Sequence, residues 1–546
     1  MYARVTSSGL IMQFNTKKKV LAIVGGGSIA TSVVCQLVDE VNAAGGCDIA
    51  CILLFDPCLI IGAGIAYQLD CASNVLNTRA GAMSPINSNP GHFVAWLKGN
   101  EKKWKAFFPQ VIVSEDAFLP RGLFGLYLEN IFQDSKQALH TLGVSVQHIR
   151  SVVSGLAAIN SGYVLQTCSE SYFADNVVLG IGNLQSSEWD HLFLEPGFFS
   201  SPYPCSSLVR NIGSSQSVCI LGTGLSAIDT AVALADSGHQ GKLIMASRGG
   251  RLPSVRGNKG TRCASRSFAR ENIRALIKRS HCHLTLAQVY QLLVDELFQL
   301  QGFKVDMDDI LHQEAGPHHY LDIEVHDAVG QERVWQTLLY SLNESIDLIW
   351  HYLDDVDKAR FENEFKSRWL AYRVSFPMQN AIKLQKLLHS DQLSVFGGVR
   401  RTWRDEASSR FATCIYDHRR GFSATIYSDA LVNSAVFTND VFHCRSTLVR
   451  QMLDSGLATA HPFGGVVVDF DTNELCTRTG TLLSGVFALG ALTSGTHFWT
   501  NAMNVNARLA RNIVQILVQS GKVKFQGLAS LPKVSPTQIS QHLPYQ

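Results

Sequence analysis

A glycine-rich turn at residues 20–30 (VLAIVGGGSIA) constrains the fold of this chain more than any other feature. An apolar run predicts a buried strand, and the residues from Ser28 onward have a helical pattern. Gly25, Gly27 and Ala30 occupy the small positions of the spacing G-x-G-x-x-G/A. This spacing gives a tight turn, lets a pyrophosphate approach the helix N-terminus, and lets helix and strand pack closely. A glycine-rich turn without a ligand is the alternative.

Two later features favour a dinucleotide-binding turn. Residues 50–55 form a second strand-like run that ends in Asp56, an acid placed to hydrogen-bond a ribose hydroxyl. The distance of 31 positions from Gly25 (56 − 25) is longer than the usual gap of about 20. Residues 218–229 (VCILGTGLSAID) repeat the opening pattern, and the small positions are now held by Gly222, Gly224 and Ala227.

The second copy predicts a different nucleotide. Its helix begins at Ser226, and the strand that follows, residues 242–246, leads to Arg248 rather than to an acid. An acid favours a free 2′-hydroxyl, whereas an arginine can pair with the 2′-phosphate of NADP. Arg251 and Arg256 add positive charge nearby, although such a cluster can also be a solvated loop. We therefore predict FAD in the first domain and NADPH in the second, with hydride passing from nicotinamide to flavin.

Composition limits the other functions that a chain of this kind can have. The length of 546 residues predicts two or three domains, and 46% hydrophobic with 17% charged residues is typical of a soluble globular protein. A net charge of +2 gives no electrostatic reason to expect nucleic acid or an anionic membrane as a partner. The thirteen cysteines are scattered without a C-x-x-C pair, which argues against a disulfide reductase and predicts a reducing compartment. We expect a cytoplasmic protein without a membrane span, and a homo-oligomer is allowed.

The order of the patterns predicts an α/β protein with two Rossmann-like, three-layer domains and a helical insertion. Because strands resume near residues 393–396, 411–416 and 424–437, we expect the chain to return to the flavin domain there. The predicted segments are a flexible N-terminus (1–19), the first part of the FAD domain (20–205), the first part of the NADPH domain (206–262), a helical insertion that covers the active site or only packs against it (263–375), the end of the NADPH domain with the return to the FAD domain (376–440), the C-terminal part of the FAD domain (441–521) and a tail (522–546).

Several single residues follow from these patterns. Arg121 stands just before an amphipathic helix, where it could meet a phosphate or carboxylate, or form a surface ion pair. Two further strands end in Gly182 and Gly490, where glycine lets the backbone approach a cofactor. The paired histidines at 281/283 and 318/319 lack cysteine or carboxylate partners at ligand spacing, so we predict no metal site.

Seven motifs occur in an order that resembles the bacterial FAD/NAD(P)-binding oxidoreductase family: GGGSIA, GAGIAY, NVLNTRAGAMS, FLPRGLFGLYL, DNVVLGIGN, GTGLSAID and SRGGRLP. The closing GVFALGALTSGTHFWTNA resembles the family's flavin-contacting C-terminal segment. The resemblance covers residues 20–260 and 480–515 but not the helical region 263–370. More distantly, the layout is similar to the class B flavin monooxygenases, including amino-acid and diamine N-hydroxylases. One departure is the absence of the usual A-T-G strand ending before the terminal domain.

This resemblance implies a mechanism and a set of site residues. NADPH reduces FAD, oxygen adds at the flavin C4a, and the hydroperoxide transfers an oxygen atom to a small amine or amino acid, as in natural-product assembly. Asn77 would bind the flavin, His497 would handle a proton near C4a, and Asn501 would lie near the ring, although each could be a loop hydrogen-bonder. An amino-acid substrate needs an arginine for its carboxylate, and Arg79 and Arg373 are candidates. Two alternatives stay open: an oxidase or reductase without oxygen insertion, and a non-catalytic FAD-binding redox sensor.

Overall fold

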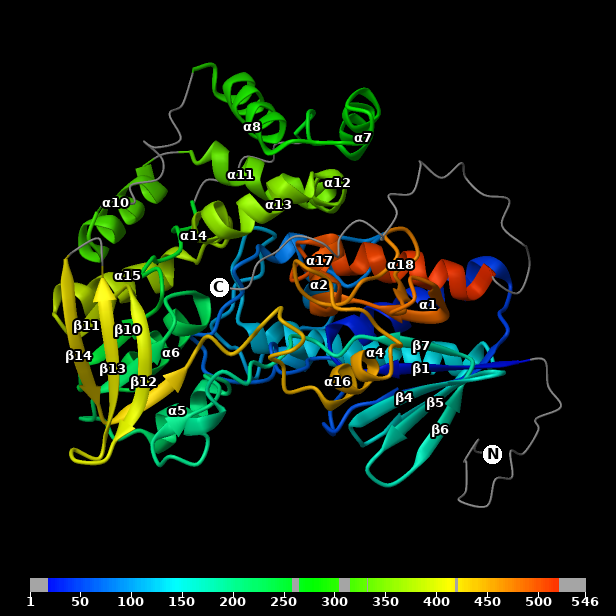
Figure 1. Cartoon of the computed structure of the whole chain (residues 1–546), viewed down its shortest axis with the longest axis horizontal. Helices are drawn as coiled ribbons and strands as arrows, with labels where there is room; N and C mark the ends of the chain where they lie inside the picture. The colour runs from blue at the N-terminus through cyan, green and yellow to red at the C-terminus, as the bar shows by residue number, and fades with distance from the viewer. Residues whose placement is uncertain (1–17, 258–264, 304–314, 331, 418–420, 520–546) are drawn as a thin grey trace.

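The computed structural model of the chain describes residues 18–257, 265–303, 315–330, 332–417 and 421–519. Among these residues, two sheets with their own helices lie beside each other, and a further layer of helices lies along one side of the molecule (Figure 1). Residues 1–17 of the predicted N-terminal segment, and residues 520–546, which include the predicted tail, lie outside the described residues.

The first sheet is built around β1 (Lys19–Val24), which pairs in parallel with β2 (Ile49–Phe55) and with β7 (Asn176–Leu179). The predicted strand–helix–strand arrangement around the first glycine turn is therefore confirmed. The sheet is completed by β3 (Ser145–Ile149), β16 (Glu474–Cys476) and β17 (Leu482–Ala488), in the order β16-β17-β7-β1-β2-β3. Only the β16–β17 pair is antiparallel among these described strands.

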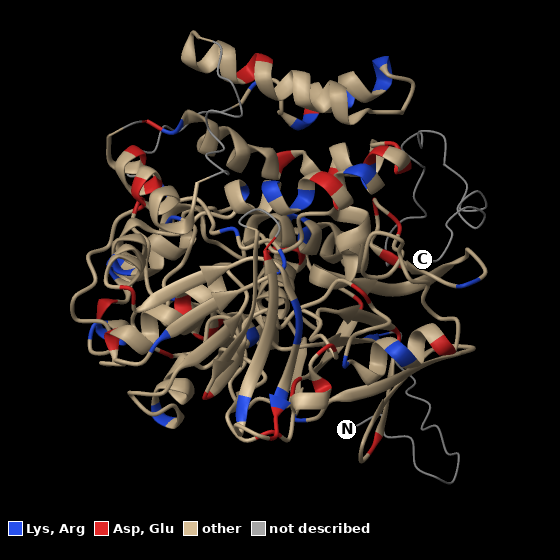
Figure 2. Cartoon of the chain, turned by 60° about the vertical axis from the view of Figure 1, so that its left-hand side comes forward, with Lys and Arg blue, Asp and Glu red and all other residues tan. Residues whose placement is uncertain are grey.

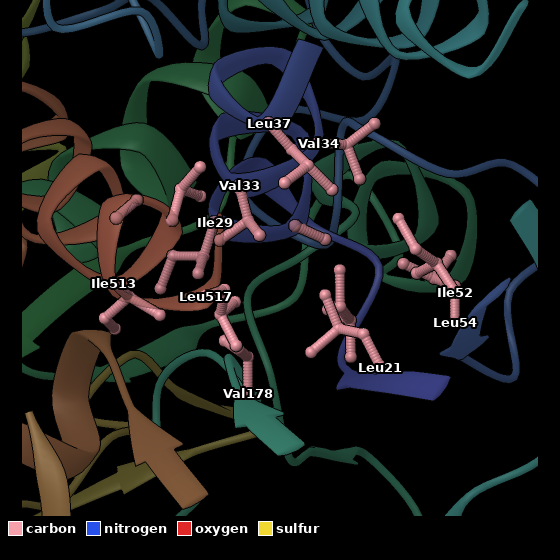
Figure 3. Close-up of a cluster of buried hydrophobic side chains, with 14 of the residues drawn as sticks. Leu21, Ile29, Val33, Val34, Leu37, Ile52, Leu54, Val178, Ile513 and Leu517 are labelled. Atoms are coloured by element: carbon pink, nitrogen blue, oxygen red, sulfur yellow. The ribbon is translucent and has the colours of Figure 1, made fainter. Parts of the chain in front are cut away.

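The first sheet is covered on both faces, as a parallel sheet requires. Leu21 and Ile23 of β1 lie on the face of the sheet that the helices cover, whereas Ala22 and Val24 lie on the opposite face. Successive side chains thus alternate between the two faces, as in any β-strand. Figure 3 shows the core on the helical face, where Val33 and Leu37 approach the sheet. One face is covered by α1 (Ser28–Ala44), α4 (Arg121–Thr141) and α18 (Met503–Gln519), and the other by β4 (Val153–Ile159), β5 (Gly162–Thr167), β6 (Ser171–Ala174) and α16 (Thr447–Asp454).

The second sheet contains the second glycine turn between β9 (Val218–Leu221) and α6 (Leu225–Asp236). Its other strands are β8 (Phe198–Phe199), β10 (Leu243–Ala246), β11 (Leu393–Phe396) and β15 (Ala430–Asn433), in the parallel order β11-β10-β9-β15-β8. One face carries α5 (Cys205–Asn211), α6 and α15 (Met378–His389), and the other carries the antiparallel strands β12 (Val399–Asp405), β13 (Arg410–Asp417) and β14 (Phe422–Ser428).

The expectation that the chain has returned to the flavin domain by residue 393 is wrong. β11 and β15 belong to the second sheet, and β12–β14 cover its face. The return comes after Asn433, where isolated bridges join Gln185 to Phe437 and Ser186 to Cys444. The crossing in the other direction also comes earlier than residue 205, because β8 already pairs with β15.

The predicted insertion is helical in its described parts. Helix α8 starts with a reciprocal capping box between Thr285 and Gln288, the two-way bond that stabilises a helix start. Most of these helices share a core of their own that reaches Phe463, Phe498 and Trp499 of the first domain, whereas α10 packs into the core of the second domain through Tyr320, Leu321 and Ala328. The described helices of the insertion are α7 (Arg270–Arg279), α8 (Leu286–Gln301), α10 (Pro317–Gly330), α11 (Val334–Ser341), α12 (Ile346–Tyr352), α13 (Asp355–Arg360) and α14 (Lys366–Arg373), with the short turns η3 (Leu342–Glu344) and η4 (Phe361–Phe365).

The remaining short elements lie in the loops of the first domain. They are η1 (Ala80–Ala82), α2 (His92–Gly99), α3 (Glu101–Trp104), η5 (Gly490–Thr493) and α17 (Ser494–His497), whereas η2 (Asp190–Leu192) packs on the second sheet through Leu192. In the described ranges, no helix is long and apolar enough to cross a membrane. Basic and acidic residues alternate over the outer helices in the view of Figure 2.

Candidate functional site

The first glycine turn, between β1 and α1, has a backbone that only glycine can form. Gly25 has φ +102°, and a Cβ there would lie 2.3 Å from the carbonyl oxygen of Gly180, just after β7. The Gly25 N–H donates to the Phe55 carbonyl at 2.8 Å, and the Gly62 N–H donates to the Gly26 carbonyl at 2.8 Å. The left-handed backbone and the neighbouring strand therefore both exclude a side chain at residue 25.

The second glycines of the two turns, Gly27 and Gly224, lack a side chain for a different reason. Each is the N-cap of its helix, with φ −86° and −83°, an extended backbone that other residues adopt. A Cβ on Gly224 would meet nothing within 4 Å, and one on Gly27 would meet only the Gly64 Cα at 3.7 Å. The protein itself leaves room for a side chain, so a group that approaches the helix N-terminus from outside explains the glycines. Both turns therefore fit the pyrophosphate of a dinucleotide.

Asp56 lies at the end of β2, as predicted, but its carboxylate already accepts two backbone hydrogen bonds. Oδ2 accepts from the Gly26 N–H at 2.7 Å, and Oδ1 accepts from the Cys58 N–H at 2.8 Å. Asp56 thus holds the glycine turn in place, a role that the sequence reasoning missed. Contact with a ribose stays a prediction, for which each oxygen keeps a second lone pair.

Arg121, at the start of α4, forms an ion pair between the two domains. It contacts Asp229 of α6 at 2.8 Å, and its side chain is only 16% exposed. It also donates to the Tyr203 hydroxyl at 2.8 Å, and that hydroxyl donates to Asp229 at 2.8 Å. The ion pair expected for Arg121 is confirmed, although it is buried and not on the surface; contact with a cofactor phosphate stays a prediction. The Ser226 hydroxyl lies 3.2 Å from the same Tyr203 hydroxyl, so its side chain also serves the domain junction.

Three segments that are far apart in the sequence meet around the start of α1. Gly64 approaches Gly27, Gly180 approaches Gly25, and a Cβ on Gly490 would lie 2.6 Å from the Ile29 side chain. The glycine predicted after β17 therefore allows close packing of η5 against α1. The structure gives the other predicted cofactor residues the following places: half-buried Ser28 and fully buried Ala30 in α1, half-buried Asn77 in the loop before η1, exposed Gly182 after β7, Gly222 with φ +125° after β9, and exposed Arg248 after β10.

The structure does not support the catalytic role expected for His497. Its ring has no exposed surface, and neither ring nitrogen has a hydrogen-bond partner among the described residues. The ring lies 5.2 Å from that of Phe470, and burial lowers its pKa to about 4. A buried, neutral ring without exposed atoms has no surface on which to meet a cofactor or substrate. Asn501 is exposed just before α18, and its predicted place near the flavin ring stays a prediction.

We expect His497 to make the folded protein sensitive to acid. An unfolded chain protonates a histidine near pH 6.5, but the folded chain protonates His497 only near pH 4. Between these values the unfolded state binds more protons, so the free energy of unfolding falls as the pH falls, by about 2 kcal/mol from pH 7 to pH 5 for this group. Urea unfolding at both pH values should show a loss smaller by that amount in His497→Leu. The exposed His140→Leu is the control, and equal losses in all three proteins would contradict the prediction.

The charged groups around His497 join the helical insertion to the C-terminal segment. Asp347 of α12, 1% exposed, pairs with Arg270 of α7 at 2.7 Å and with Arg508 of α18 at 3.1 Å. These groups and His351 are the charges that act on the His497 ring. The insertion is therefore bound to both domains and does not stand apart from the first.

Phe498 has a strained backbone that α12 supports. Its φ is +60° and its ψ −66°, and the Trp499 N–H donates to the His497 carbonyl at 2.7 Å, the pattern of a strained γ-turn. The Trp350 ring stacks on the Phe498 ring at 4.6 Å, and the Trp350 indole N–H donates to the Gly495 carbonyl at 2.7 Å. The segment that is expected to contact flavin thus has its shape fixed by the helical insertion. No sequence pattern indicated this turn, because strain depends on contacts between distant residues.

Comparison with known proteins agrees with the geometry of the first turn. Residues 22–184 match a family model described as FAD-NAD(P)-binding. These residues belong to an FAD/NAD(P)-binding domain, which β16, β17 and α18 complete. Among curated proteins, no sequence matches the chain.

Solved structures share the fold over nearly the whole chain at low sequence identity. The Kutzneria sp. 744 ornithine N-hydroxylase, with reduced FAD, NADP+ and L-ornithine, is 14% identical, and the match covers 92% of this chain and 100% of that chain with a TM-score of 0.54. The L-lysine 6-monooxygenase of Pseudomonas syringae is 13% identical, with 91% and 99% covered and a TM-score of 0.56. The cadaverine monooxygenase of desferrioxamine biosynthesis from Erwinia amylovora, bound to FAD, is 14% identical, with 97% and 99% covered and a TM-score of 0.50. The predicted α/β fold with two Rossmann-like domains is thereby confirmed.

Proposed function

We propose that this protein is an FAD-dependent, NADPH-consuming monooxygenase that N-hydroxylates a small amine or amino acid. One observation carries the proposal: each of the two parallel sheets has a glycine turn whose second glycine has open space where a side chain would lie. The fold that contains these turns is shared with amine and amino-acid hydroxylases over at least 91% of the chain. Two such turns imply two dinucleotides, and a reaction between them is the simplest reason to hold both.

The residues around the turns support a division between the two cofactors. The first turn has Asp56 beside it and meets the segments of Gly64, Gly180 and Gly490, so it would hold FAD. The second turn is followed by the exposed Arg248, so it would hold NADPH through the 2′-phosphate. Bound FAD would accept hydride from NADPH and supply the electrons for oxygen activation.

The chain's own side chains bind and orient in this proposal and do not attack the substrate. The Arg121–Tyr203–Asp229 contact holds α4 of the first domain against α6 of the second, and so fixes the two turns relative to each other. The helical insertion fixes the segment around Phe498 through Trp350. A protected site of this kind excludes water from a reactive cofactor.

The experiment follows where the electrons of NADPH go. Purified protein with bound FAD should oxidise NADPH in air, and with the correct amine it should form a hydroxylamine while releasing little hydrogen peroxide. Hydrogen peroxide equal to the NADPH consumed, with every amine and amino acid tested, would contradict oxygen insertion and favour an oxidase. Bound FAD without any NADPH oxidation would favour the redox sensor.

A further inference from the structure

Two arginines of the second domain and its insertion lie on the ring of one tyrosine. Arg256, in the loop after β10, has its guanidinium 3.5 Å from the centroid of the Tyr340 ring in α11. Arg373, at the end of α14, lies 4.1 Å from the same centroid and 4.6 Å from that of Trp499. Helices α11 and α14 are neighbours in the helical layer (Figure 1). Trp499 belongs to the C-terminal segment of the first domain, so this group lies where the domains and the insertion meet.

Neither arginine has a carboxylate partner among the described residues. Arg256 donates to the Ser375 hydroxyl at 3.4 Å, and Arg373 donates to the Asn343 side-chain carbonyl, both neutral acceptors. Arg373 is 2% exposed, and its buried Nε has no hydrogen-bond partner. Burial and the neighbouring arginine lower the pKa of Arg373 to about 10. Two unneutralised guanidinium groups in a buried place are costly unless an anion joins them.

Buried side chains hold the loop of Arg256 firmly in position. The Val255 N–H donates to Glu324 Oε2 at 2.7 Å, and the Val255 carbonyl accepts from Arg333 at 3.1 Å and from Gln336 at 2.7 Å. The Gly257 N–H donates to Gln336 at 3.0 Å. The arginine pair is therefore a preorganised feature and not a solvated surface cluster.

The first domain also touches this loop. Arg79 donates to the Gly257 carbonyl at 3.0 Å, and its other nitrogen pairs with Asp116 at 3.4 Å. Of the two arginines expected to hold a substrate carboxylate, Arg79 thus already has a carboxylate partner. Arg373 does not, and Arg256 joins it.

We propose that Arg256 and Arg373, placed on the two sides of Tyr340, bind a carboxylate of the substrate. The inference rests on the proposed function and narrows its substrate class from amines in general to amino acids. The guanidinium groups use their faces on the aromatic ring, which leaves N–H edges for an anion. A carboxylate can accept from two such edges at once, and the Tyr340 hydroxyl, which lies 3.1 Å from the Ser375 hydroxyl, offers a further polar contact. Arg256 and Tyr340 remain partly exposed and give the carboxylate its way in.

The test compares amino acids with their own decarboxylated amines on FAD-loaded protein. Calorimetry would measure binding of the proteinogenic amino acids and ornithine, each beside its amine, such as L-lysine beside cadaverine. We expect at least one amino acid to bind at least tenfold more tightly than its amine. Arg256→Gln and Arg373→Gln should each remove most of that advantage, whereas Arg360→Gln, on an exposed ion pair of the same helical layer, should leave it unchanged.

Separate arms exclude misfolding and a phosphate ligand. Arg373→Lys keeps a charge but loses the planar fork, so it should fold as the wild type does and still weaken amino-acid binding. The phosphate probe 2′,5′-ADP should bind equally to the wild type and to Arg256→Gln. Weaker 2′,5′-ADP binding with unchanged amino-acid binding would overturn the proposal, because the arginines would then hold nucleotide phosphate. So would a wild type in which no amino acid binds better than its amine.

The binding measurement needs no turnover, which separates this inference from the proposed function. Arginine-dependent amino-acid binding without a hydroxylated product would leave the inference standing and overturn the monooxygenase. Hydroxylation of a simple amine that is unaffected by Arg256→Gln and Arg373→Lys would support the monooxygenase and overturn the inference on the arginines.

Discussion

Replacing Gly224 with valine is expected to raise the KM for NADPH about a hundredfold, equivalent to about 2.7 kcal/mol of lost binding. A Cβ at Gly224 meets nothing within 4 Å and the backbone there is extended, so the variant should fold with at most the small loss of an altered N-cap. The valine would instead occupy the space through which a pyrophosphate reaches the start of α6. Steady-state rates with NADPH and NADH would measure the effect, and both should suffer because both contain a pyrophosphate.

Two variants show whether the effect belongs to the nucleotide. Gly91→Val changes another helix N-cap glycine with φ −85° and nothing within 4 Å, so it should leave both KM values unchanged. Arg248→Ala should raise the KM for NADPH about tenfold and that for NADH little, because only NADPH has a 2′-phosphate. An unaltered KM in Gly224→Val would place the NADPH pyrophosphate elsewhere, and equal effects of Arg248→Ala on both nucleotides would place the 2′-phosphate elsewhere. FAD content should be that of the wild type in all three variants.

The parts of the fold that depend on neighbouring residues were predictable from the sequence. The two glycine turns follow from residue spacing, because strand, turn and helix are adjacent in the chain. The start of α6 at Leu225 lies within one residue of the predicted start at Ser226. The sheet to which a strand belongs was not predictable in the same way. β13 and β14 have ordinary strand patterns, and their place on the second sheet depends on contacts with residues such as Cys219 and Leu221.

The site residues divide along the same line. Arg121 was recognised as a charged residue before a helix, but its partner Asp229 is 108 positions away (229 − 121) and no local pattern joins the two. His497 belongs to a segment that resembles a flavin contact, yet α12 and Phe470 bury it completely. Tyr340 carries no motif, and its importance comes from Arg256 and Arg373 on its ring. Burial and pairing of distant charges therefore set the limit of what the sequence shows.

The second large effect is expected on the free energy of unfolding, when the ion pair between Glu324 and Arg333 is broken. Arg333→Met is expected to lower the free energy of unfolding by about 3–5 kcal/mol, because it leaves a buried carboxylate without its partner. The two groups are 2.6 Å apart, with side chains 1% and 5% exposed. Urea unfolding would measure the loss. The exposed Arg360–Glu364 pair, at 56% and 58%, provides the control Arg360→Met, with an expected loss of at most about 0.5 kcal/mol.

A double variant separates the lost partner from lost packing at this pair. Glu324→Leu/Arg333→Met removes both charges, so it should regain more than half of the stability that Arg333→Met loses. The remainder should be about 1–2 kcal/mol, because the Val255 N–H then has no acceptor. If the double variant is no more stable than Arg333→Met, Arg333 stabilises the protein by packing and not by neutralising Glu324.

Because Val255 precedes Arg256, both variants should also weaken amino-acid binding, and the double variant should do so even where its stability recovers. The stability of the Glu324–Arg333 pair and the position of Arg256 then depend on the same three side chains, Glu324, Arg333 and Gln336.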